Sequence, residues 1–156
     1  LSCQPRLLIA DEPTTALDVT IQAQFLKLLK ELQQQHNLSL IIVTHDLGII
    51  AKVCDRVAVM YAGRIVETGD VREIFYSPAH PYTKALLGSL PKMDVKEERL
   101  YTIEGQPPEL HDLPPGCSFS PRCPDATEIC TQEYPPQFII KDGHFVNCWL
   151  FASGKE

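Results

Sequence analysis

Residues 7–18 read LLIADEPTTALD, and this stretch decides how the first half of the chain folds. Residues 7–10 form a short continuous apolar run, which is typical of a strand buried on both faces. Two carboxylates, Asp11 and Glu12, follow the run directly, and Asp18 can cap a helix that begins at Val19. The stretch therefore predicts a strand, a polar strand end and the start of a helix.

Residues beyond this stretch continue the alternation of helix and strand. A helical spacing of apolar residues predicts one buried stripe on the helix, made by Ile21, Phe25, Leu28, Leu29 and Leu32. A second buried strand at 38–43 completes a right-handed parallel crossover unit. The pattern then predicts a helix at 47–54, a hairpin of strands 56–61 and 64–68 around Ala62-Gly63, and short helices at 71–75 and 82–90.

The prolines are unevenly distributed and suggest a division of the chain. Of 13 prolines, only Pro5 and Pro13 precede residue 77. Proline interrupts helices and sheets, so the second half is expected to consist of turns and irregular chain. We place a domain over residues 1–90 and an irregular extension over residues 91–156, opening with a charged connector at 92–99.

The composition restricts the class of protein. The 156 residues include 14 Lys and Arg against 20 Asp and Glu, giving a net charge of −6, and 44% are hydrophobic. A packed core is possible, and the acidic balance argues against nucleic acid as a partner. The apolar runs are too short to span a membrane, and the first residues do not form a signal peptide. A first residue other than Met suggests a piece of a longer chain.

Polar side chains follow both predicted parallel strands at their carboxyl ends. Asp11 and Glu12 end the first strand, and Thr44, His45 and Asp46 follow the second. Ligands of open parallel sheets bind at this edge, where paired carboxylates suit magnesium and water activation and a histidine could reach a phosphoryl group. The alternative is structural, because acidic residues commonly begin turns and a lone His is usually a satisfied residue. Spacing alone favours this alternative.

Three longer strings resemble the ATPase subunits of ABC transporters. Residues 7–18 resemble the Walker B and D-loop segment, 43–47 the switch-histidine loop, and 55–69 the strand pair that follows. They occur in the family's order and separation, although Thr15 stands where the D-loop often begins with Ser. The resemblance implies an α/β fold, the C-terminal part of a P-loop-type ABC ATPase domain whose sheet is mostly parallel with flanking helices.

The resemblance also implies roles for individual residues. Asp11 would hold the Mg²⁺ of Mg-ATP through its water shell, and Glu12 would be the general base that polarises the attacking water. His45 would contact the γ-phosphate of ATP, and Asp18 would lie at the interface with a second ATPase subunit. These roles fit phosphoryl transfer, which depends on positioning and electrostatics.

The phosphate-binding motif of that family has no counterpart in the sequence. None of the eight glycines fits the pattern G-x-x-x-x-G-K-[ST], and residues 1–4 resemble the Leu-Ser-Gly-Gly-Gln signature only superficially. The chain thus resembles the C-terminal portion of such a subunit. Without backbone amides and a Lys around the phosphates, we expect the chain alone neither to bind nor to hydrolyse ATP appreciably.

Strings in the second half of the sequence narrow the resemblance to one group of ABC-transporter ATPases. Residues 77–87, SPAHPYTKALL, could simply form a turn into an amphipathic helix, but they resemble the HPYT segment of peptide and nickel importer ATPases. Residues 103–108 and 113–123 resemble the C-terminal oligopeptide/dipeptide transporter extension of those subunits. The implied function is ATP-driven import of di- or oligopeptides, with nickel as an alternative cargo.

The same resemblance implies the partners and the location of the subunit. The partners would be a second ATPase subunit, transmembrane permease subunits and, indirectly, a peptide-binding protein. The subunit would be peripheral, at the cytoplasmic face of the inner membrane, because the permease subunits would hold it there.

Four cysteines of the second half, spaced C-x5-C-x6-C-x17-C, are candidate metal ligands: Cys117, Cys123, Cys130 and Cys148. Their segment has little core of its own and needs a staple, while a reducing compartment disfavours disulfides. Four thiolates suit an iron–sulfur cluster or structural zinc, although the C-x2-C pairing of zinc ribbons is lacking. The family resemblance implies a [4Fe-4S] cluster, with zinc or unliganded thiols as alternatives.

Three other residues of this segment are secondary candidates. His111 and His144 are possible substitute ligands, although solvated loop histidines are the simpler interpretation. Arg122 could donate hydrogen bonds to a cluster or face water. A second functional hypothesis follows from the cysteines, namely a metal-binding interaction or regulatory module that docks on the transporter.

Overall fold

The computed structural model describes residues 5–90 and 103–152. The predicted connector at 92–99 and the signature-like residues 1–4 lie outside the described residues. The chain divides into two compact units, Leu1–Cys54 and Asp55–Glu156. Each unit is described by itself.

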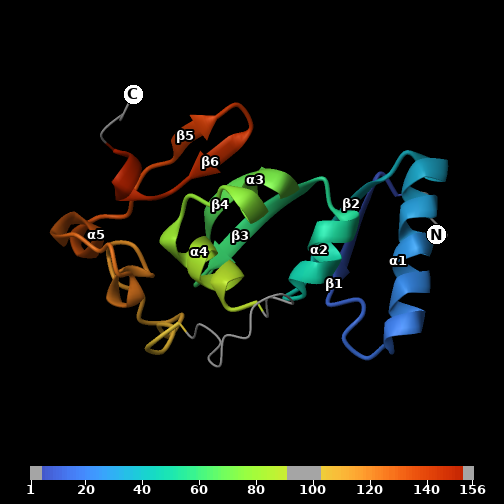
Figure 1. Cartoon of the computed structure of the whole chain (residues 1–156), viewed down its shortest axis with the longest axis horizontal. Coiled ribbons are helices and arrows are strands. Elements are labelled where there is room, and N and C mark those ends of the chain that lie inside the picture. Colours follow the sequence, from blue (N-terminus) through green and yellow to red (C-terminus); the bar gives the residue numbers. More distant parts are fainter. Residues whose placement is uncertain (1–4, 91–102, 153–156) are drawn as a thin grey trace. The chain divides into compact units, whose positions relative to one another are not determined.

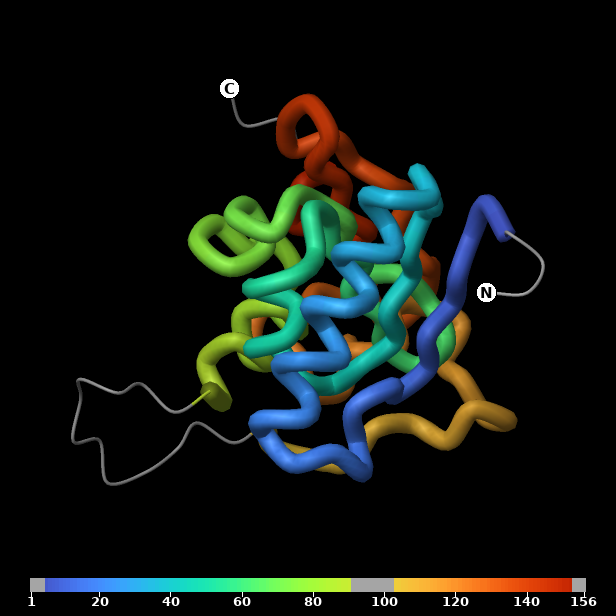
Figure 2. Tube along the Cα trace, turned by 90° about the vertical axis from the view of Figure 1, so that its right-hand side faces the viewer, coloured from blue at the N-terminus to red at the C-terminus, as the bar shows by residue number. Residues whose placement is uncertain are grey.

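The first unit is a strand–helix crossover followed by a short helix (Figure 1). Its elements are β1 (Leu7–Asp11), α1 (Val19–His36), β2 (Ser39–Val43) and α2 (Leu47–Val53). Strands β1 and β2 pair in parallel, with Leu7 opposite Ser39 and Asp11 opposite Val43. Helix α1 runs alongside this strand pair in both views (Figures 1 and 2). The predicted parallel crossover is confirmed.

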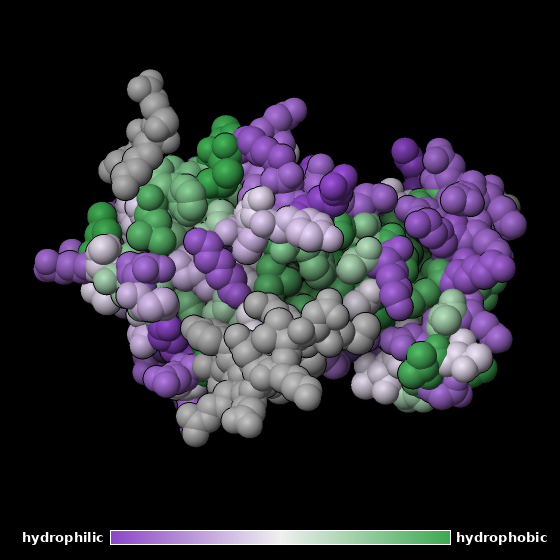
Figure 3. Space-filling model, viewed as in Figure 1, coloured by the Kyte–Doolittle hydropathy of each residue, from purple (hydrophilic) through white to green (hydrophobic). Residues whose placement is uncertain are grey.

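Capping fixes where α1 begins and ends. The Asp18 carboxylate accepts hydrogen bonds from the backbone N–H of Thr20 at 3.0 Å and of Ile21 at 2.9 Å, as the sequence predicts. At the other end, Asn37 adopts the left-handed conformation with φ 48°. Hydrophilic side chains gather over α1 in Figure 3, which is the expected solvent face of an amphipathic helix.

The strands of the first unit differ from their prediction. Both were expected to be buried on both faces, but their residues alternate between exposed and half-buried, and Ile9 is 62% exposed. The reason is the size of the sheet, since β1 and β2 form a sheet of only two strands within the described residues. The apolar stripe of α1 is likewise only partly buried, with Leu29 inside and Ile21 and Leu28 exposed.

The second unit is built on a four-stranded antiparallel sheet. Its elements are β3 (Arg56–Tyr61), β4 (Arg64–Asp70), α3 (Val71–Tyr76), α4 (Pro81–Gly88), the 3-10 helix η1 (Ser120–Arg122), α5 (Glu128–Gln132), β5 (Phe138–Lys141), β6 (His144–Val146) and the 3-10 helix η2 (Trp149–Phe151). The strand order is β3-β4-β6-β5, and every neighbouring pair is antiparallel. The predicted hairpin and both predicted helices are present.

This sheet corrects two expectations. A mostly parallel sheet is wrong for the described residues, because four of the six strands are joined antiparallel. Two-residue turns enforce that direction: Ala62 and Gly63 both have positive φ, and Gly143 has φ 76° between β5 and β6. The second half is also less irregular than its prolines predict, since β6 pairs with β4, with Glu67 opposite Val146. This pairing joins a strand of the predicted domain, residues 1–90, to a strand of the predicted extension, residues 91–156.

A close backbone approach holds the cysteine-bearing segment together. The backbone N–H of Cys117 donates to the carbonyl oxygen of Cys130 at 2.8 Å. A Cβ atom added at Gly116 would lie 2.2 Å from that same oxygen and 2.8 Å from the carbonyl carbon of Thr131. Only glycine therefore fits at residue 116. Within the described residues, no helix is long and apolar enough to cross a membrane.

We predict that Gly116→Ala lowers the free energy of unfolding by roughly 1–3 kcal/mol, because backbone must move to admit the methyl group. The measurement is urea unfolding followed by the fluorescence of Trp149, the single tryptophan of the chain, which lies in the second unit. The control is Gly63→Asn, where φ is +78°, nothing lies within 4 Å and Asn tolerates the left-handed conformation. Equal midpoints for Gly116→Ala and the control would refute the steric argument.

Candidate functional site

The parallel pairing of the first unit brings its predicted site residues to one edge. Asp11 ends β1, and Glu12 follows it with φ 43°. The backbone N–H of Glu12 donates to the carbonyl oxygen of Val43, the last residue of β2, at 2.8 Å. This bond lets the pairing continue one residue past the strand, so that Glu12 faces the loop that carries His45.

Glu12 and His45 are in direct contact. His45 Nδ1 lies 2.7 Å from Glu12 Oε1, and the backbone N–H of His45 donates to the same oxygen at 3.2 Å. The Thr15 hydroxyl donates to Glu12 Oε2 at 2.9 Å. The hydrogen bonds from His45 and Thr15 lower the pKa of Glu12, and the hydrogen bond to Glu12 raises the pKa of His45. The structure thus brings together the two predicted catalytic residues as an exposed ion pair.

The neighbouring acidic residues serve the local fold. Asp18 is engaged in capping α1, and Asp46 caps α2 by accepting from the N–H of Gly48 at 2.8 Å and of Ile49 at 3.3 Å. Sequence reasoning missed the cap at Asp46, although an Asp one residue before a helix is its usual signal. Asp11 lies at the strand end beside Glu12, where its role as a magnesium ligand stays a prediction.

We predict a pH dependence for the Glu12–His45 pair. By NMR titration, the pKa of His45 should lie above 6.5, and Glu12→Gln should lower it toward 6.5. Because that pKa is raised on folding, the pair's contribution to stability from His45 is complete below pH 6.5 and is lost as pH rises through the raised value. At acid pH, the contribution to stability from Glu12 is lost as pH falls below 4.5 and through the lowered pKa of Glu12. Asp11→Asn is the control, and an unchanged His45 pKa in Glu12→Gln would contradict the pairing.

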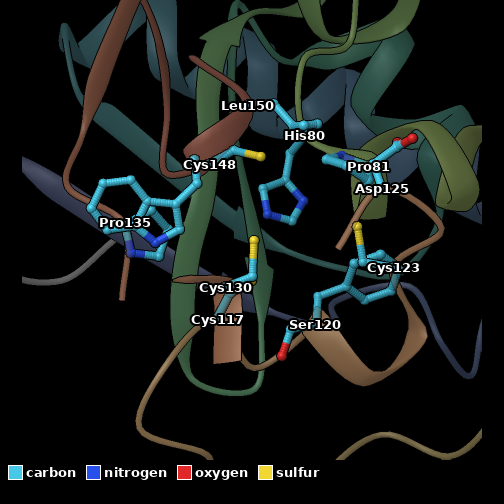
Figure 4. Close-up of a pocket in the computed structure, with 12 residues that line it drawn as sticks. His80, Pro81, Cys117, Ser120, Cys123, Asp125, Cys130, Pro135, Cys148 and Leu150 are labelled. Carbon is cyan, nitrogen blue, oxygen red and sulfur yellow. The ribbon is translucent and has the colours of Figure 1, made fainter. Parts of the chain in front are cut away.

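The four predicted cysteines of the second unit line one small pocket (Figure 4). They come from three places: Cys117 and Cys123 flank η1, Cys130 lies on α5, and Cys148 precedes η2. None of the four forms a disulfide. Among the described residues, however, no group of three or more His, Cys, Asp or Glu side chains is spaced as the ligands of a metal ion.

Burial controls the thiols of this pocket. It raises the pKa of Cys148 to about 11, and it also raises the pKa of Cys117 and of Cys123. Each of these three pKa values is raised further by the other thiols of the pocket. Cys117, Cys123 and Cys148 are therefore protonated at neutral pH unless a cation lies among them.

A histidine that sequence reasoning did not select also lines the pocket. His80, only 1% exposed, precedes α4, and its Nδ1 accepts the backbone N–H of Tyr82 at 3.0 Å. Its Nε2 is buried without a hydrogen-bond partner among the described residues. Burial lowers the pKa of His80 to about 4, so the ring is neutral at pH 7. The HPYT string was the available signal, since its His occupies the helix-capping position.

A buried carboxylate holds the backbone of His80. Glu67, on β4 and 1% exposed, accepts from the backbone N–H of Ala79 at 2.7 Å and of His80 at 2.9 Å. His144 Nε2 lies 2.7 Å from Glu67 Oε1 and is equally buried. Sequence reasoning missed Glu67, because β4 reads RIVETGD and its other polar residues gave no signal that this carboxylate is buried.

The structure decides among the alternatives for three secondary candidates, and it confirms the solvated alternative for His111. His144 is neither a metal ligand nor a solvated loop residue, because it pairs with Glu67 inside the unit. Arg122 is half-buried and does not line the cysteine pocket; it donates to the carbonyl oxygens of Ile103 and Glu104, each at 2.8 Å, and to the Tyr61 hydroxyl. His111 is exposed beside Glu109, away from the cysteines that line the pocket.

Comparisons with known proteins match nearly the whole chain. Residues 66–130 match the family described as "Oligopeptide/dipeptide transporter, C-terminal region". The dipeptide transport ATP-binding protein DppD of Bacillus subtilis is 57% identical over 150 residues, covering 96% of this chain and 45% of DppD. The oligopeptide transport ATP-binding protein OppD of Haemophilus influenzae is 55% identical over 152 residues, covering 97% of this chain and 47% of OppD. The chain thus spans about half the length of these curated relatives.

One solved structure with similarity is cbiO1 of Clostridium perfringens, described as part of the ABC transporter complex cbiONQ. It is 40% identical to this chain, with a TM-score of 0.44, and the match covers 47% of this chain and 30% of the cbiO1 chain.

The sequence matches define the class: the chain belongs to the ATP-binding proteins of ABC transporters. Within that class it belongs to the oligopeptide and dipeptide transport ATP-binding proteins and corresponds to their C-terminal part.

Proposed function

We propose that the chain is part of the ATP-hydrolysing subunit of an ABC importer of di- or oligopeptides. The observation that carries this proposal is the contact between Glu12 and His45 at the carboxyl end of a parallel strand pair. The relatives DppD and OppD support the peptide cargo, and nickel remains the alternative cargo. In this proposal residues 1–90 belong to the ATPase domain and 91–156 to the extension.

The proposed partners follow from the same family. They are a second ATPase subunit, permease subunits in the membrane and, through these, a peptide-binding protein. The subunit would work at the cytoplasmic face of the membrane, held there by the permeases. Asp18 would face the second subunit while it continues to cap α1.

The residues at the strand end fit ATP hydrolysis with Mg²⁺. Asp11 would hold Mg²⁺ through its water shell, and the metal would neutralise charge on the phosphates. Glu12 has to accept a proton from water, but both its oxygens already accept hydrogen bonds from His45 and Thr15. Turning the His45 side chain toward the γ-phosphate would remove the Nδ1 contact with Glu12 Oε1 and leave that oxygen only the backbone N–H of His45 at 3.2 Å, so that it could accept from water. The contact therefore represents a resting arrangement in which His45 restrains the general base.

We predict that Glu12→Gln abolishes turnover but keeps ATP binding when this chain is joined to the upstream half of DppD from Bacillus subtilis. Loss of the general base should lower the ATPase rate by about 100-fold or more, because Gln keeps the shape of Glu but accepts no proton. The measurements are phosphate release and binding of a fluorescent ATP analogue.

The matched control is Glu31→Gln on α1, an exposed carboxylate 3.8 Å from Lys27 within the same helix. Its ATPase rate should equal that of the unmodified chimera. A normal rate in Glu12→Gln would refute the assignment of the general base, and His45→Ala tests the other half of the pair in the same assay.

The cysteine pocket favours a second function, a metal-binding module within the subunit. Four soft sulfur donors line one pocket. Burial raises the pKa of Cys117, Cys123 and Cys148, and a bound cation would offset that penalty by stabilising the thiolates. The sulfurs are not spaced for one ion. In a [4Fe-4S] cluster each cysteine binds a different iron, so the ligand sulfurs lie farther apart than around a single zinc ion. The donor set therefore suits a cluster better than zinc.

We predict that the chain purified without oxygen is brown, with about four irons and four sulfides per chain. Replacing the four pocket cysteines by Ser should remove the colour and the iron, because Ser oxygen is a poor ligand for iron–sulfur clusters. Cys54→Ser, in the first unit, is the control and should keep both. Stoichiometric zinc without colour would replace the cluster by structural zinc, and a metal-free chain would overturn the metal site.

A further inference from the structure

We propose that His80 is a hydrogen-bond donor to the metal-bound sulfur of the four-cysteine pocket, through its Nε2–H. The role is that of a positioning residue, which sets the stability and the reduction potential of the bound group without ligating it. This inference rests on the metal site proposed above, and it concerns a residue of the HPYT string that the ATPase function leaves unused.

The hydrogen bonding of the ring fixes its tautomer. Nδ1 accepts the backbone N–H of Tyr82 at 3.0 Å and so carries no proton. A neutral imidazole has one N–H, which must then be on Nε2. His80 is therefore a donor toward the pocket and does not present a free nitrogen lone pair there, which excludes it as a ligand in this arrangement.

That donor is buried in the pocket that the four cysteines line. Nε2 has no hydrogen-bond partner among the described residues, and His80 is 1% exposed. Figure 4 shows the imidazole among the labelled cysteines, and all of them line the same pocket. Neutral thiols are weak acceptors, whereas a thiolate or sulfide bound to a metal is a strong one. A bound metal group would supply the acceptor that this N–H lacks.

Contacts with both the backbone and the ring of His80 hold the imidazole in this orientation. Glu67 accepts the backbone N–H of His80 at 2.9 Å, and His144 fixes Glu67 in turn. The Tyr82 N–H prevents the ring from flipping, because a flipped ring would leave that N–H without its acceptor. The Phe119 ring lies 6.0 Å from the imidazole, centroid to centroid. The donor is thus preorganised, as residues around metal ligands usually are.

Two substitutions test the roles of the two ring nitrogens of His80 separately. In His80→Asn, the amide oxygen can replace Nδ1 as acceptor for Tyr82, but nothing replaces the Nε2 donor. In His80→Gln, the longer amide can place an N–H where Nε2 stands, while the cap on α4 is lost. Both variants of the full chain are purified without oxygen beside the wild type, and thermal unfolding by circular dichroism confirms their folding.

The readouts are the rate of metal loss to a chelator and the reduction potential of the bound cluster. We expect His80→Asn to lose metal about 10–100-fold faster and to have a lower potential, since a hydrogen bond to sulfur favours the reduced, more negative cluster. His80→Gln should stay near the wild type in both readouts. In the wild-type chain, ¹⁵N NMR should assign the ring proton of His80 to Nε2.

The outcomes distinguish this proposal from the metal site itself. A wild-type chain without metal overturns both. A loaded wild type with unchanged potential and metal loss in His80→Asn overturns the His80 role alone. If His80→Gln changes metal loss and reduction potential as much as His80→Asn does, the His80 role is overturned as well, because a hydrogen-bond donor at this position then makes no difference. If His80→Asn does not fold, a ring proton found on Nδ1 in the wild type overturns the proposal, and one found on Nε2 with a chemical shift that moves on metal loading supports it.

Discussion

The buried carboxylate of Glu67 is the constraint around which the second unit is arranged. A carboxyl group at 1% exposure is costly to bury unless it is hydrogen-bonded. Glu67 accepts hydrogen bonds from two backbone N–H groups and lies 2.7 Å from His144 Nε2. These partners lie on the loop before α4 and on β6, so one side chain on β4 joins three segments. Removing a partner of such a carboxylate typically costs about 3–5 kcal/mol. The β4–β6 pairing and the position of His80 both depend on this carboxylate.

The first unit relies on short polar residues at the ends of its elements. Asp18 and Asp46 cap the two helices, and each cap is typically worth about 1 kcal/mol. Glu12 is different, because its φ of 43° is an uncommon conformation for a non-glycine residue and costs about 1 kcal/mol or more. Local folding explains the two aspartates, whereas the strained Glu12 with its His45 contact points to chemistry.

The sequence predicts features that depend on neighbouring residues and fails where distant segments meet. The β1–α1–β2 crossover, the cap at Asp18 and the Ala62-Gly63 turn follow from local patterns, and the structure has them. The pairing of β6 with β4 joins residues nearly 80 positions apart, and no local pattern indicates it. The same holds for Glu67 and His144. The four cysteines could be selected by residue type and spacing, but His80 required knowledge of which atom its Nδ1 contacts.

His80 connects the local fold to the pocket because its two nitrogens have different tasks. Nδ1 starts α4 by capping, which is a requirement of folding and is met by the chain itself. Nε2 is left without an acceptor in the described residues, and a buried unsatisfied donor costs about 1–3 kcal/mol. The same pocket contains Cys148, whose thiol pKa is raised by burial. In the metal site proposed above, a cation bound by the sulfurs would relieve both penalties at once.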